Sequence, residues 1–144
     1  MGEKSQSTNL ASEFYVLSVL YRKGFNAHLT LGNKKSVDIV VEIDEKIKTI
    51  DVKGLLDKSL FPLDNWTNSD KNHFIVFVSF LKKMNDLTII PECYVVPAAD
   101  ILKKQKELDG ESLLYQNPKG NRKGVQYCKL NKLRKKYLNN FDLL

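Results

Sequence analysis

The chain has 144 residues, 42% of them hydrophobic, and a formal net charge of +6 at pH 7, which predicts one domain, residues 1–144, with an ordinary hydrophobic core. Its apolar runs are far shorter than the roughly 20 residues that a membrane-spanning helix needs. The amino terminus has no apolar core of the kind found in secretory signals, so we expect a cytoplasmic protein without a membrane partner.

The first predicted element is a helix from about Thr8 to Lys23, which Gly24 ends. Its expected apolar stripe consists of Leu10, Phe14, Leu17, Leu20 and Tyr21. Glu13 falls inside this stripe in helical projection. A carboxylate at such a place costs free energy unless it has a partner, so Glu13 is either a functional residue or one half of a structural ion pair.

A strand from Phe25 to Leu31 precedes a hairpin whose strands cover residues 36–41 and 49–54. If Asp44 and Glu45 form a two-residue turn, the two residue numbers of every cross-strand pair add up to 89. Asp38 then lies opposite Asp51. A slip of one residue would send Asp38 to the other face. The apolar pattern favours the first register, because it gathers five aliphatic residues on one face: Val37, Ile39, Val41, Ile50 and Val52.

Three charged residues of this hairpin are expected to share the other face. Directly opposed residues have Cβ atoms roughly 4.5–5.5 Å apart, where like charges such as Asp38 and Asp51 are destabilising. Lys53 lies two residues beyond Asp51 and therefore on its face. A divalent cation would relieve the repulsion, and hard cations such as Mg²⁺ prefer oxygen ligands. Taken alone, Asp51 and Lys53 are better explained as solvent-facing residues of a half-exposed strand, and the alternative for Asp38 is a surface charge near the preceding turn.

The rest of the chain predicts a mixture of strands and helices. Residues 55–72 indicate an irregular loop, and the apolar run from His73 to Leu81 indicates a central strand buried on both faces. The further expected elements are a strand extension at 88–90, a strand at 92–96, a helix at 98–108, a short strand at 125–130 and a last helix at 131–140.

The carboxy-terminal segment is strongly basic. Between Pro118 and Phe141 the sequence has no acidic residue. The basic residues there are Lys119, Arg122, Lys123, Lys129, Lys132, Arg134, Lys135 and Lys136. A segment with one sign of charge suits a polyanion such as nucleic acid, and the alternative is a solvated helix face.

The order of helix, strand, Asp-bearing strand and a strand with Asp51-Val52-Lys53 resembles the PD-(D/E)XK nuclease superfamily. Asp38 takes the place of the first motif Asp, and Val37 replaces the often-quoted Pro. Glu13 falls where archaeal Holliday-junction resolvases carry a Glu on their first helix. The resemblance covers about residues 10–54. It implies a restriction-endonuclease-like α/β fold, in which a mixed central β-sheet is flanked by helices and αβββ forms the core.

The resemblance also implies an activity: metal-dependent hydrolysis of phosphodiester bonds. DNA is the expected substrate, although the residues themselves do not distinguish DNA from RNA. Asp38, Asp51, the Val52 backbone carbonyl and Glu13 would hold Mg²⁺ or Mn²⁺, and Lys53 would position or deprotonate the attacking water. The basic segment would bind the nucleic acid backbone. Because many relatives act as dimers, a homodimer is an expected state.

Two other functions remain open from the sequence. One is a catalytically inactive nucleic-acid-binding or interaction module on the same fold. The other is a small structural or immunity-type protein whose basic segment keeps it soluble.

Overall fold

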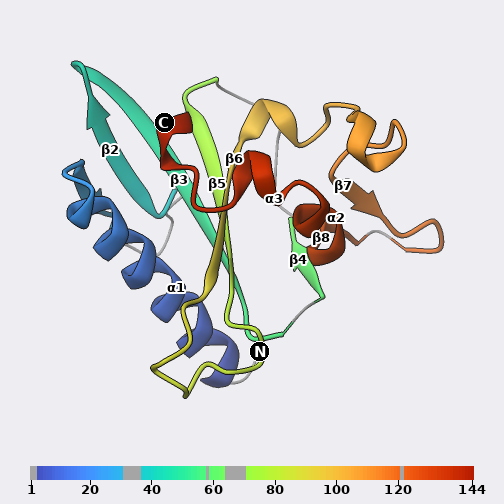
Figure 1. The fold of residues 1–144 in the computed structure, drawn as a ribbon, viewed down its shortest axis with the longest axis horizontal. Coiled ribbons are helices and arrows are strands. Elements are labelled where there is room, and N and C mark those ends of the chain that lie inside the picture. The colour runs from blue at the N-terminus through green and yellow to red at the C-terminus, as the bar shows by residue number, and fades with distance from the viewer. Residues whose placement is uncertain (1–2, 31–36, 58, 64–70, 121) are drawn as a thin grey trace.

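The computed structural model describes residues 3–30, 37–57, 59–63, 71–120 and 122–144, and it centres on a five-stranded mixed sheet (Figure 1). The strand order is β1-β2-β3-β5-β6. The strands are β1 (Asn26–Leu29), β2 (Ile39–Ile43), β3 (Lys46–Leu55), β5 (His73–Ser79) and β6 (Glu92–Pro97). β3 and β5 run parallel, and the other neighbours are antiparallel. The predicted class, an α/β fold with a mixed central sheet flanked by helices, is confirmed.

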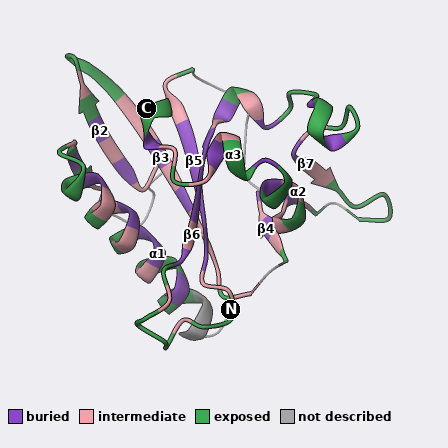
Figure 2. Cartoon of the chain, in the orientation of Figure 1, coloured by how far each residue is buried: buried purple, intermediate pink, exposed green. Residues whose placement is uncertain are grey.

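Two different layers cover the faces of this sheet (Figure 1). The helix α1 (Glu3–Arg22) lies on one face, where Val16 and Leu20 pack against Ile50 and Val52. On the other face lies a small sheet of order β4-β8-β7, together with α2 (Tyr127–Lys132) and α3 (Arg134–Tyr137). The strands of the small sheet are β4 (Leu60–Pro62), β7 (Leu114–Gln116) and β8 (Lys123–Gln126). Both faces of β5 are therefore buried, as its near-continuous apolar run predicts (Figure 2).

The predicted hairpin register is confirmed along the whole β2–β3 ladder. Ile39 pairs with Ile50 and Ile43 pairs with Lys46. Asp44 and Glu45 form the turn with φ values of 50° and 65°. Positive φ at both central residues is what a two-residue type I′ turn requires, although Asn-Gly or Asp-Gly is the commoner pair.

The connection from β3 to β5 contains a strand that the sequence did not indicate. β4 lies within the segment predicted as an irregular loop, and it pairs with the distant β8. Gly124 of β8 is required there, because a Cβ atom at this position would lie 2.4 Å from the Phe61 carbonyl oxygen. Residues 64–70 of the predicted loop are outside the described part of the chain.

The predicted apolar stripe of the first helix is wrong for three of its five residues, whereas Leu20 is buried and Leu17 packs against the core as predicted. Leu10, Phe14 and Tyr21 are exposed. Among the described side chains of α1, the buried ones are Thr8, Ser12, Glu13, Val16 and Leu20. The reason is a close approach between α1 and β3. A Cβ atom on Gly54 would lie 2.1 Å from Ser12 Oγ, so the helix packs with its small hydroxyl side chains against a bare strand backbone.

The helix predicted for residues 98–108 is also wrong. Residues 98–108 form two short 3₁₀ turns, Ala98–Asp100 and Lys106–Leu108, rather than one helix. Their apolar residues have too little periodicity for a helical face, and Gln105 is instead buried against the Tyr137 hydroxyl.

The expected strand at 125–130 and the expected helix at 131–140 have different bounds. β8 ends at Gln126, and α2 begins at the next residue. Leu133 then separates α2 from α3, because its backbone (φ −106°, ψ 21°) leaves the helical region while its side chain stays buried. Residues 88–90 lie in a turn region rather than in a strand. In the described part of the chain, no helix is long and apolar enough to span a bilayer.

Candidate active site at the edge of β3

Asp38 directly precedes β2, at the place where β3 extends past β2 while remaining paired with β5. Its N–H donates to the Ile50 carbonyl oxygen (2.9 Å), and its carboxylate oxygen Oδ2 accepts a hydrogen bond from the Val52 N–H (2.7 Å). Thr30 fixes the same segment, since its N–H donates to the Asp38 carbonyl oxygen and its hydroxyl donates to the Val37 carbonyl oxygen. The pairing of β2 with β3 stops at Ile39. Beyond it, the Asp38 carboxylate accepts the hydrogen bond from β3 that a backbone carbonyl of a neighbouring strand would otherwise accept.

Asp51 and Lys53 project from one face of β3, as the alternation predicts. Their cross-strand neighbours Ile75 and Phe77 belong to the core beneath the small sheet, on the side opposite α1. Lys53 Nζ lies 3.2 Å from Asp51 Oδ2. The two side chains are 34% and 24% exposed, respectively, so this ion pair is reachable from solvent but largely surrounded by protein.

The environment of Asp51 disfavours its charged form. Burial is the main cause, and it raises the pKa of Asp51 to about 6 from the usual 3.8, although the charge of Lys53 opposes this rise. The side-chain hydrogen bond with Asp38 and the negative charge of Asp38 raise the pKa further. The structure therefore brings Asp38, Asp51 and Lys53 together, and the two carboxyl groups repel each other when both are ionised.

The oxygen atoms at this edge fit a hard divalent cation. Within a strand, the N–H and C=O of one residue point to the same side. Because the Val52 N–H points toward Asp38, the Val52 carbonyl also points to the edge that β2 leaves uncovered. Two neighbouring carboxylates and a carbonyl are the ligand type that Mg²⁺ prefers. Among the described residues, no group of three or more His, Cys, Asp and Glu side chains is arranged to hold a metal ion.

Glu13 lies on the α1 side of the sheet. It is buried (6% exposed), and its neighbour Ser12 contacts Gly54, the residue that follows Lys53. The predicted burial of this carboxylate is thus confirmed. Asp51 and Lys53 project from the opposite face of β3, so the role of Glu13 as a member of the same cluster stays a prediction.

The predicted nucleic-acid-binding residues are spread over the layer that contains the small sheet and the short helices. Lys119, Arg122, Lys132 and Lys135 are exposed. Three others are engaged within the protein: Lys129 with Glu111 (3.4 Å), Arg134 with Glu92 (3.0 Å) and Lys136 with the Gln105 side chain (3.0 Å). Only 14% of the Lys129 side chain is exposed, compared with 46% of the Arg134 side chain.

Sequence reasoning missed two residues, Thr30 and Glu92. Thr30 could not be found, because its role depends on the exact path of the chain before β2. Glu92 could have been suspected, because strand alternation places it on the same face as Tyr94 and it is one of the acidic residues that contact the basic segment.

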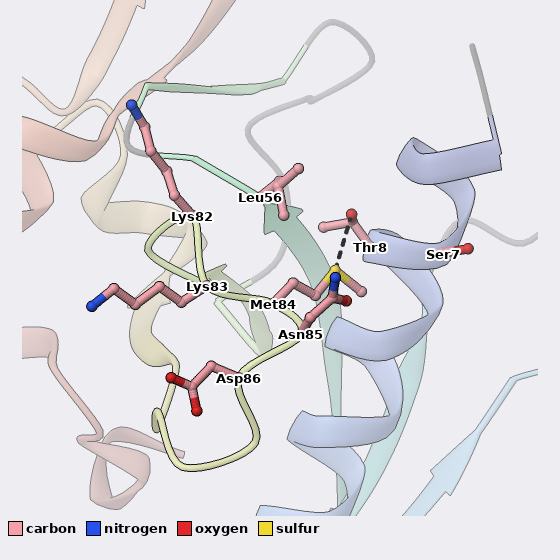
Figure 3. Close-up of a pocket in the computed structure, with 8 residues that line it drawn as sticks. All are labelled: Ser7, Thr8, Leu56, Lys82, Lys83, Met84, Asn85 and Asp86. Carbon is pink, nitrogen blue, oxygen red and sulfur yellow. Dashed lines mark hydrogen bonds between the residues drawn. The ribbon is translucent and has the colours of Figure 1, made fainter.

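A cavity of about 610 Å³ lies near the carboxyl ends of β3 and β5 but contains none of the predicted site residues. Figure 3 shows that Met84 points toward Thr8 of α1, whereas the ammonium groups of Lys82 and Lys83 point away from that helix. Thr8 Oγ1 lies 3.5 Å from Met84 Sδ. Binding sites usually have polar groups that converge on the ligand, and the two lysines of this cavity diverge.

Comparison with known proteins gives one structural similarity. No family model matches the chain, and no curated protein matches it. A solved structure described as a bacterial homing endonuclease, I-Ssp6803I, is similar with a TM-score of 0.46 and 14% sequence identity. The similarity covers 68% of this chain and 67% of that one.

Proposed function

We propose that this protein, as a single domain of 144 residues, is a Mg²⁺- or Mn²⁺-dependent endonuclease of the PD-(D/E)XK type. The observation that carries the proposal is the contact of Asp38 with Asp51 and of Asp51 with Lys53 at the open edge of β3. A structural role explains this cluster poorly, because burial and mutual repulsion make the ionised Asp51 unfavourable.

Each residue has a defined part in the proposed chemistry. Asp38, Asp51 and the Val52 carbonyl would supply the ligand oxygens, and Glu13, on the α1 side of the sheet, would complete the acidic cluster directly or through water. When bound, a divalent cation supplies positive charge next to the scissile phosphate and lowers the pKa of a nearby water. Lys53, held 3.2 Å from Asp51, orients that water or stabilises the negative charge that develops on the phosphate.

DNA is the proposed substrate, and the basic residues of the carboxy-terminal segment are the proposed backbone contacts. Contacts between lysines or arginines and phosphates are insensitive to sequence and weaken as the salt concentration rises. A cytoplasmic location and a homodimeric state belong to the same proposal. Sedimentation of the purified protein tests the dimer.

The decisive experiment measures cleavage of plasmid and branched DNA with Mg²⁺ or Mn²⁺. Lys53→Ala should lower the rate at least about a hundredfold, which is the usual effect of losing one acid–base or charge-stabilising group. Lys46→Ala is the matched control, because Lys46 lies on the same strand but is exposed beside the turn. Equal cleavage by Lys53→Ala and the parent protein would refute the proposed site.

A second function, an inactive nucleic-acid-binding module, is favoured by one observation. The basic segment is attached to the sheet through Arg134 and Glu92, neither of which belongs to the carboxylate cluster, so this attachment does not depend on a bound metal. DNA binding with no metal-dependent product would support this second function over the first.

A further inference from the structure

The Glu92 carboxylate accepts hydrogen bonds from three side chains and so connects the basic segment to the central sheet. It lies at the start of β6, on the face covered by α2 and α3. Its Oε1 atom accepts hydrogen bonds from the hydroxyl groups of Tyr127 and Tyr94. Its Oε2 atom accepts a hydrogen bond from Arg134 Nη2 at 3.0 Å. Only 16% of the Glu92 side chain is exposed, so these partners replace most of its water.

The carboxylate of Glu92 is kept ionised by these partners. Burial alone would raise its pKa, but the hydrogen bonds from Tyr127, Arg134 and Tyr94 and the charge of Arg134 outweigh burial and lower the pKa. A permanent negative charge therefore faces the guanidinium group of Arg134. A charge-assisted pair of this kind is shorter and stronger than a hydrogen bond between neutral groups.

Part of the Arg134 guanidinium group is hydrogen-bonded within the protein, and the rest of the side chain is exposed to solvent. Besides the bond to Glu92, its Nη1 atom donates to the Asn131 side-chain oxygen. The Arg134 side chain is nevertheless 46% exposed. A guanidinium group has five N–H donors in a rigid plane, so fixing part of it by Glu92 and Asn131 also fixes the direction of the remaining donors.

Strand register places this pair on the same face as the candidate active site. Leu55 of β3 pairs with Ser79 of β5, which in turn pairs with Glu92. Adjacent strands lie about 4.7–4.9 Å apart, so Glu92 is about 10 Å across the sheet from Leu55. Leu55 follows Lys53 by two residues and shares its face. One strand of duplex DNA carries a phosphate for about every 3.4 Å of helix axis. A separation of about 10 Å across the sheet therefore corresponds to about three phosphates, so a phosphate that flanks a bound scissile phosphate can reach this part of the sheet.

We propose that Arg134 contacts a backbone phosphate flanking the cleaved bond and that Glu92 is the positioning residue that holds Arg134 in the orientation for this contact. The inference rests on the proposed nuclease function. It differs from a general attraction between a basic segment and DNA, because it requires a negatively charged residue for tight binding to a polyanion.

The test measures binding of a labelled DNA duplex by fluorescence anisotropy in EDTA, between 50 and 200 mM salt. A role of net charge alone predicts that Glu92→Gln, which removes a negative charge, binds DNA more tightly. A positioning role predicts the opposite, a several-fold weaker affinity. Arg134→Gln should lower the slope of log K against log salt by about 0.9, the loss of one phosphate contact. Arg134→Lys keeps the charge but loses the planar fork, and its affinity should fall toward that of Arg134→Gln.

Glu107→Gln is the matched control, because Glu107 is exposed and its charge acts on Tyr137 of α3. This variant removes the same charge from the same layer without touching Arg134, and it should bind DNA as tightly as the parent or more tightly. Glu92→Gln binding at least as tightly as the parent would overturn the inference and leave the nuclease proposal intact. If circular dichroism shows that Glu92→Gln is unfolded, the DNA affinity of Arg134→Lys becomes the test. An affinity of Arg134→Lys equal to that of the parent overturns the inference. A parent protein that does not bind DNA at 50 mM salt would overturn both proposals.

Discussion

Replacing Asp51 by Asn should stabilise the protein when no metal is present. Asp51 has a pKa of about 6 in the folded protein, because burial and the neighbouring Asp38 outweigh the attraction of Lys53. The folded state therefore holds the Asp51 proton more tightly than the unfolded state, where the pKa is about 3.9. Stability must then fall as the pH rises from about 4 to about 6 and stay lower above that range.

The size of the effect follows from the same values. At 1.36 kcal/mol per pKa unit, the rise from 3.8 to about 6 corresponds to about 3 kcal/mol. This is an upper bound, because a quarter of the Asp51 side chain remains in contact with solvent, which screens the charges. Asn has a similar volume and does not ionise, so Asp51→Asn should be more stable than the parent at pH 7.5 and nearly equal to it at pH 4.

Urea unfolding of both proteins in EDTA, at half-unit steps between pH 4 and pH 8, measures this difference. The comparison cancels the titration of all other carboxyl groups, which the two proteins share. Adding Mn²⁺ at pH 7.5 should then stabilise the parent and leave Asp51→Asn unchanged, because a ligand that binds only the folded state adds its binding free energy to stability. A stability difference between the two proteins that does not change with pH would contradict the raised pKa of Asp51.

Two further predictions concern parts of the molecule beside the site. Gly54→Ala should destabilise the protein by about 1–3 kcal/mol, as overpacking does, because the new methyl group would lie 2.1 Å from Ser12 Oγ. Thermal unfolding measures this loss of stability. An unchanged unfolding midpoint would contradict the close packing of α1 on β3. Burial raises the pKa of Cys93 to about 12, whereas Cys128 is exposed. A thiol reagent at pH 8 should therefore modify one thiol per native chain and two per chain in denaturant, and two rapidly reacting thiols in the native protein would show that Cys93 is accessible.

The hairpin could be predicted closely because its evidence is local. Period-two alternation and a two-residue turn determine the pairing of residues 39–43 with 46–50, and this pairing places Asp51 and Lys53 on one face. The same register brings Asp38 close to Asp51. The exact path of Asp38 could not be predicted, because it depends on where the ladder stops and on the hydrogen bond to the Val52 N–H.

The remaining errors come from contacts between distant segments. The exposure of Phe14 and the burial of Ser12 depend on Gly54, which lies some forty residues later in the chain. Likewise, β4 forms a strand because β8 pairs with it, and its own three residues carry no alternation that would indicate one. The burial of Gln105 depends on Tyr137 and overrides the weak helical tendency of its own segment.

The hydrogen bond from the Val52 N–H to Asp38 affects how inactive variants should be interpreted. A side chain without an oxygen atom at position 38, such as Ala, would leave the Val52 amide without its acceptor at a half-buried place, and this can loosen β3 beside Lys53. Loss of cleavage in Asp38→Ala would thus mix a damaged scaffold with a missing carboxylate. Asp38→Asn retains an acceptor oxygen for that amide, and it is the substitution that separates the chemical role of this residue from its architectural one.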